Sequence, residues 1–142
     1  FSYSAKYARA GDIHFTLGSA TVLEDGRRLL RIFAANELAA LRDATCSVTF
    51  DGFADRLGGA GYNDVLSELR AENTKTALQD CLDRTVAAAM TVHGHGERVL
   101  ELLDEVFDFP DDSAAPEWRR VFVLLHGEAS VELVVRDLKD VE

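Results

Sequence analysis

The stretch RLGGAGYND, residues 56–64, lies where the hydrophobic pattern of this chain changes. In the segment directly before it, apolar residues recur at every second position, as in a half-buried strand. In the segment directly after it, they recur every three to four residues, as in an amphipathic helix. Glycine tolerates sharp turns, and Asn63 or Asp64 can cap the helix that follows. We therefore interpret this stretch as the junction between a sheet-forming part and a helix-forming part.

A β-hairpin is predicted over residues 11–33. Apolar and polar residues alternate in 13–17 and again in 30–32, which is typical of strands with one buried face. Asp25 and Gly26 lie between these two segments, and the pair Asp-Gly is a frequent two-residue hairpin turn because glycine accepts a positive φ.

The middle of the chain changes from a strand pattern to a helical one. A short helix is predicted over 37–43, capped by Asn36, and a β-branched strand over 45–50. Helical spacing of apolar residues then runs through 63–92, either as one helix or as two with a break near Asn73.

A further helix and a second hairpin are predicted toward the C-terminus. The segment 96–109 keeps helical spacing and ends before Pro110, whereas 118–138 returns to period two on both sides of a glycine turn. Because strands and helices are segregated, the sequence predicts a single α+β domain over 1–142. We expect an antiparallel sheet built from the N- and C-terminal hairpins, with three to four helices packed on one face.

Composition limits the class of partner. The chain has 142 residues, 47% of them hydrophobic, and a net charge of −10. This charge disfavours nucleic-acid binding, which needs a basic surface, and favours a basic protein partner. No apolar run approaches the roughly 20 residues of a membrane span, so we expect a soluble protein without membrane association, in an undetermined compartment. Cys46 and Cys81 are predicted to be small buried side chains; whether they pair stays open.

The glycine loop itself is a candidate ligand site. Arg56, Gly59 and Gly61 fit the pattern R-x-x-G-x-G between a strand and a helix. This pattern resembles the pyrophosphate-binding loop of GNAT acetyltransferases, and the resemblance implies that backbone amides here bind the pyrophosphate of coenzyme A. The alternative, which we favour, is a hinge in which the glycines only turn the chain into the helix.

Two histidines form a candidate metal site. His93 and His95 are separated by one glycine, and Glu97 follows, so the side chains could reach one divalent ion. The alternative, which we favour, is a connection between helices, in which Gly94 ends one helix and Gly96 lets the chain reverse.

The candidate partner-binding surface is acidic. Several carboxylates share one face of the predicted 96–109 helix, and two more extend the run into the next loop. Like charges at this spacing repel, so a face that keeps them can serve a basic partner. The residues are Glu97, Glu101, Asp104, Glu105, Asp108, Asp111 and Asp112.

The function predicted from these patterns is non-catalytic binding of another protein. The sequence contains neither G-x-S-x-G nor H-E-x-x-H, and we expect no enzymatic activity and no cofactor. Acidic proteins of this size include inhibitors or immunity proteins, chaperone-like adaptors and accessory subunits, and a homodimer through a sheet edge is a further expectation. The alternative function is small-ligand or metal binding at the glycine loop or at the histidine pair.

Overall fold

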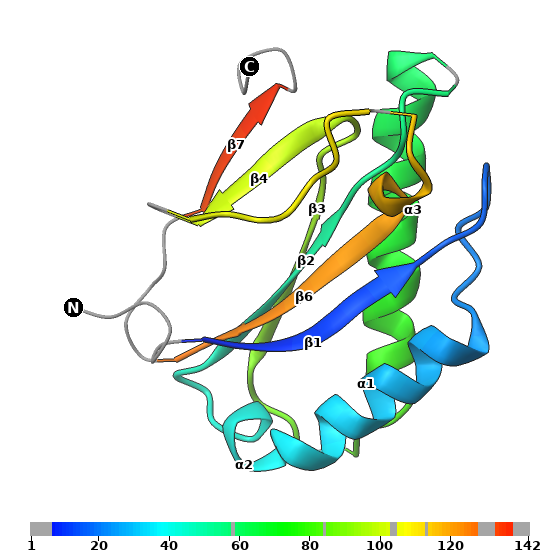
Figure 1. Ribbon diagram of the computed structural model, residues 1–142. Helices are drawn as coiled ribbons and strands as arrows, with labels where there is room; N and C mark the ends of the chain where they lie inside the picture. Colours follow the sequence, from blue (N-terminus) through cyan, green and yellow to red (C-terminus); the bar gives the residue numbers. More distant parts are fainter. Residues whose placement is uncertain are drawn as a thin grey trace.

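The computed structural model describes residues 7–57, 59–83, 85–102, 105–112, 114–127 and 133–137 (Figure 1). Its main sheet has four strands in the order β1-β6-β2-β3. They are β1 (Tyr7–His14), β6 (Arg120–His126), β2 (Ser47–Gly52) and β3 (Ala89–Gly94). β6 runs antiparallel to both of its neighbours, whereas β2 and β3 run parallel.

Three helices accompany this sheet: α1 (Glu24–Asn36), the one-turn α2 (Leu38–Leu41) and α3 (Ala60–Gln79). α3 connects the parallel strands β2 and β3, as a crossover helix must. It continues without interruption past Asn73, whose side chain donates a hydrogen bond to the carbonyl of Ala20. The helix predicted through 63–92 is wrong in its last part, because α3 ends at Gln79 and residues 89–94 form β3. None of the helices in the described ranges is long and apolar enough to cross a membrane.

One face of the main sheet packs against α1 and α3. Alternate residues of the strands point to this face, among them Phe50, Val121 and Val123, and they contact Leu30 and Leu78 from the helices. Aliphatic side chains dominate this layer, which forms the larger core of the molecule.

The other face is covered by a smaller sheet. Its order is β5-β4-β7, from the strands β5 (Glu105–Val106), β4 (Arg98–Leu102) and β7 (Leu133–Asp137). Leu100 from β4 packs there with Phe53, Phe107, Phe122 and Leu124. The short 3-10 helix η2 (Pro116–Trp118) precedes β6 and buries Trp118 completely. The predicted α+β class is confirmed, although the main sheet is mixed rather than antiparallel.

The predicted N-terminal hairpin is wrong in its second half. Residues 24–36 form α1, and Asp25 and Gly26 lie in its first turn instead of between strands. The buried side of this segment is Gly26, Leu30, Phe33 and Ala34, a helical spacing of three and four. Ile32, which the alternating pattern paired with Leu30, is 50% exposed.

The predicted helix over 96–109 is also wrong, because 98–102 and 105–106 are the strands β4 and β5. Val99 and Leu100 are neighbours in the sequence and both are buried. Neighbouring residues of a strand point to opposite faces, so a strand that is covered on both faces explains this burial, whereas a helical stripe does not require it. β4 pairs with β7, which follows it by more than 30 residues, and no local spacing reveals that partner. The acidic helical face is therefore absent.

The C-terminal segment forms strands as predicted, yet no hairpin. β6 pairs with β1 and β2 in the main sheet, whereas β7 pairs with β4 in the small sheet. The predictions of a short helix over 37–43 and a strand over 45–50 are confirmed by α2 and β2. The predicted cap is wrong, because Asn36 is the last residue of α1 and the N-cap residue of α2 is Glu37. Both cysteines are free; Cys46 is buried as predicted, but Cys81 is exposed.

Candidate functional site

Two glycines mark the carboxyl ends of the parallel strands, where α3 begins. Gly52 of β2 and Gly94 of β3 lie opposite each other in the strand register. A Cβ atom on Gly94 would lie 2.6 Å from the backbone nitrogen of Glu68, and one on Gly52 would collide with the carbonyl oxygen of Ser67. The absence of side chains lets the helix backbone approach the strands directly, which is a common reason for glycine in a strand.

The turn after β3 fastens this end of the sheet to α3. Gly96 has a φ of +60°, a conformation that favours glycine. Its N–H donates to the Ser67 hydroxyl at 2.9 Å, and its carbonyl accepts from the N–H of Ala54 at 2.8 Å. The same turn therefore holds both the helix and the loop that carries Asp55.

Asp55 is a buried carboxylate, 3% exposed, with two fixed partners. The Nε of Arg119 donates to Oδ2 at 2.6 Å, and the N–H of Leu57 donates to Oδ1 at 3.1 Å. Arg119 lies directly before β6, so the pair joins segments that are 64 residues apart in the sequence.

Arg70 points from α3 toward the same loop and is 1% exposed. Its guanidinium donates to the carbonyl oxygens of Phe53, Thr16 and Ser19 at 3.0, 3.1 and 2.8 Å. Burial lowers the pKa of Arg70 to about 10, while the carboxylate of Asp55 opposes this shift. Arg70 therefore remains charged at neutral pH.

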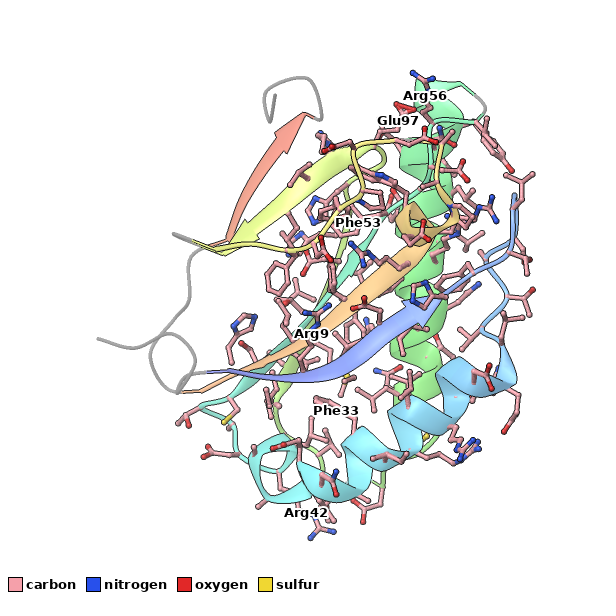
Figure 2. The ribbon with its side chains drawn as sticks, viewed as in Figure 1. Arg9, Phe33, Arg42, Phe53, Arg56 and Glu97 are labelled. Carbon is pink, nitrogen blue, oxygen red and sulfur yellow. The ribbon has the colours of Figure 1, made fainter. Side chains whose placement is uncertain are left out.

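We call Asp55, Arg70 and Arg119 the polar cluster. The half-buried Arg119 pairs with Asp55, and the buried Arg70 is close enough for the charge of Asp55 to act on its pKa, so the cluster is net positive although the chain is acidic. Arg56 and Glu97 lie at the same end of α3 (Figure 2), where Glu97 accepts a hydrogen bond from the Asn63 amide at 3.2 Å. Such fixed charges at the carboxyl ends of parallel strands can recognise a ligand that carries charged groups.

A second buried pair lies beneath this site, on the face toward the small sheet. Oδ1 of Asp51 is 2.6 Å from Nε2 of His95, and Phe53 stacks against the same imidazole with a centroid distance of 5.1 Å. His93 and His95 lie ring to ring at 6.0 Å. In the described ranges, His, Cys, Asp and Glu side chains form no group of three that could hold a metal ion.

The glycine loop ends at the first turn of α3. Gly59 is the N-cap residue, Gly61 lies in the first turn, and Arg56 is exposed beside them. This position agrees with a junction between sheet and helix; binding of a phosphate here stays a prediction, as does metal binding by His93 and His95.

The predicted acidic residues are dispersed rather than gathered on one face. Glu97 lies in the turn after β3, Glu101 on β4 and Glu105 on β5, while Asp104 lies outside the described residues. Asp108, Asp111 and Asp112 are exposed in the following loop. A role of these residues in partner binding stays a prediction.

Sequence reasoning did not identify the polar cluster. One signal was present: Ser67, Arg70 and Thr74 are polar residues with helical spacing on the buried side of α3. A buried arginine needs partners, so this pattern could have indicated a polar site beneath the helix.

Comparisons with known proteins support the fold. No protein-family model matches the sequence, and no curated protein matches it. Among solved structures, the chain is similar to the OmpA-like domain of FopA1 from Francisella tularensis subsp. tularensis SCHU S4. The TM-score is 0.61 at 19% identity, over 87% of this chain and 73% of that chain.

Two further structures give the same result. The peptidoglycan-associated lipoprotein from Burkholderia pseudomallei matches with a TM-score of 0.57 and 18% identity, over 81% of this chain and 89% of that chain. A MotB-like protein from Desulfovibrio vulgaris matches at 0.56 and 22% identity, over 81% and 70%.

The comparisons also correct the predicted partners. The neighbours include a peptidoglycan-associated lipoprotein and the periplasmic domain of MotB, which aligns over 87% of this chain with a TM-score of 0.54. The prediction of a basic protein partner and of no membrane association is therefore wrong. The predicted partner was based on a net charge, which sums over the whole chain and does not describe one site. The predicted lack of membrane association was based on the lack of a spanning apolar run, and a domain can associate with a membrane system without spanning the bilayer. The chain thus shares the fold of OmpA-like and MotB-like domains.

Proposed function

We propose that this chain is a non-catalytic domain that binds peptidoglycan at the polar cluster. The observation that carries the proposal is the buried carboxylate of Asp55 between Arg70 and Arg119, at the carboxyl ends of β2 and β3. Burying charged side chains such as Asp55 and Arg70 is costly unless they have partners, and such sites often serve a function.

The fold supports this proposal. One structural neighbour is a peptidoglycan-associated lipoprotein, and the alignment spans 89% of that chain. A peptide branch of peptidoglycan carries carboxylates and amino groups, and the rim of the cluster offers both signs of charge in Arg56 and Glu97 (Figure 2). Charge-assisted hydrogen bonds are suited to such groups.

The narrower roles predicted from charge, as an inhibitor or immunity protein, adaptor or accessory subunit, stay predictions. They were based on an acidic helical face, and the structure has the strands β4 and β5 there. The broader prediction of a binding domain without catalysis is the part that the proposal keeps.

Co-sedimentation with purified peptidoglycan sacculi tests the proposal. The wild-type chain should pellet with the sacculi, and Asp55→Asn should weaken binding about tenfold, because it removes the charge and keeps the shape. Asp25→Asn, an exposed carboxylate in the first turn of α1, is the matched control. Thermal unfolding of each variant separates a loss of binding from a loss of folding. A wild-type chain that stays in the supernatant refutes the proposal.

A further inference from the structure

The N-terminal half of α3 carries an exposed apolar surface, which we call the α3 ridge and define as Tyr62, Val65 and Leu69. Their exposed fractions are 54%, 66% and 48%. Spacings of three and four residues place them on one side of the helix, away from the buried Arg70. Exposed apolar side chains that gather in this way commonly mark a contact surface.

Tyr62 connects the α3 ridge to the polar cluster through the loop after β1. A Cβ atom on Gly18 would lie 3.7 Å from the Tyr62 hydroxyl, and the next residue, Ser19, accepts a hydrogen bond from Nε of Arg70 at 2.8 Å. Tyr62 therefore lies beside the loop whose carbonyl oxygens accept hydrogen bonds from Arg70.

We propose that the α3 ridge binds the glycan strand of peptidoglycan while the polar cluster binds the attached peptide. This inference rests on the proposed function, because it names the part of the same polymer that lies beside the site. Sugar rings are uncharged and present C–H faces to aromatic and aliphatic side chains. The ridge has the matching character, since its members are uncharged and Tyr62 combines an apolar ring with a polar end.

The placement of the two surfaces also fits a branched polymer. Tyr62 lies in the first turns of α3, next to the loop that carries Asp55, and Leu69 lies seven residues further along the helix. This distance is about 10 Å at the rise of an α-helix. A peptide bound at the helix N-terminal end would therefore leave its glycan strand along the ridge.

Two probes separate the surfaces: intact sacculi, and stem peptides released from the same sacculi by an amidase. Tyr62→Ala should weaken binding to intact sacculi about three- to tenfold, the range expected for one aromatic contact, and leave peptide affinity unchanged. Tyr62→Phe keeps the ring and should bind both probes as the wild type does. Ile32→Ala on α1 is the matched control, since Ile32 is 50% exposed and lies outside the ridge.

Each other result overturns the inference. Equal losses for both probes would place Tyr62 in the peptide site, and no loss for either would show that the ridge takes no part. An equal loss for Ile32→Ala would indicate general adhesion of apolar groups. If Asp55→Asn abolishes binding while Tyr62→Ala keeps it, the proposed function holds and this inference fails. A wild-type chain that binds no sacculi refutes the proposed function itself.

Discussion

The two faces of the main sheet are closed in different ways. On the helical face, Phe50 and Val123 pack among aliphatic side chains of α1 and α3. On the opposite face, Phe122 lies between two guanidinium groups, with Arg9 at 4.4 Å and Arg120 at 4.8 Å from its ring centroid. The buried polar side chains that the strands themselves carry, Asp51, Arg120 and His126, therefore lie on the face that the small sheet covers.

This difference predicts how the cost of a substitution in unfolding free energy depends on the face where it is made. An aliphatic layer depends on shape, because its contacts are many and individually weak. The aromatic and polar layer depends in addition on a few directional contacts, such as the hydrogen bond from Arg120 to Asp12 at 3.0 Å. Substitutions that are equal in chemistry should therefore differ in cost between the two faces.

The largest effects should come from two single substitutions, Phe50→Ala on the helical face and Phe122→Ala on the opposite face. Both side chains are fully buried, so each change should cost about 3–5 kcal/mol of unfolding free energy. Phe122→Ala should cost more, because two cation–π contacts are lost with the ring. Urea unfolding measures both values. A smaller cost for Phe122→Ala would contradict the contrast between the faces.

The close approach of α3 to the helical face is tested at Gly52. Gly52→Ala should cost roughly 1–3 kcal/mol, because the added methyl group collides with the Ser67 carbonyl and must displace the helix. Gly59→Ala is the control: nothing lies within 4 Å of a Cβ atom there, and its φ is −80°. Thermal unfolding should show a larger loss for the first variant than for the second, whose only cost is that alanine is a poorer N-cap residue than glycine.

The directional contacts on the face that the small sheet covers are tested at Asp51. Asp51→Asn keeps the shape but weakens the contact with His95, so we expect a cost of about 1–2 kcal/mol. Asp25→Asn, which alters an exposed carboxylate, should stay within about 0.5 kcal/mol of the wild type. Denaturant unfolding at neutral pH compares the two. Equal values would show that Asp51 contributes no directional contact.

The smallest effect is a pH dependence that arises on the same face. Burial lowers the pKa of His126 below its usual 6.5, and the charge of Asp51 only partly opposes this. The folded state therefore binds this proton less readily than the unfolded state, so stability falls as the pH drops below about 6.5. Melting temperatures at pH 7.5 and 5.5 should differ less in His126→Gln than in the wild type. An unchanged difference would exclude His126 as the source.

The sequence predicts the elements whose own residues carry a clear pattern. α3 has a buried stripe along its length, and β2 is a short strand that contains β-branched residues and ends with Asp51-Gly52. The prediction fails where the pattern is short and ambiguous. The pattern of residues 30–32 fits both a strand and a helix, and the contacts of α1 with β1 and α3 favour the helix.

The candidate site is the least predictable part of the molecule. Asp55 and Arg119 are 64 residues apart, and they meet because β6 inserts between β1 and β2. The spacing of residues in the sequence does not predict that β6 lies between β1 and β2. Arg70 could have been suspected from its position on the apolar side of α3, but its partners are backbone carbonyls, which leave no trace in residue identity.

The pairing of β1 with β6 has a consequence for the order of folding. His14 lies opposite Arg120, so the first strand leaves the ribosome more than 100 residues before its partner. Contacts this distant in sequence form slowly, because a long loop must close first. α3 and the parallel pair β2–β3 can assemble earlier from a shorter segment. During synthesis, the backbone groups of β1 therefore stay unpaired until β6 has been made. The chain is most prone to misassembly during this time.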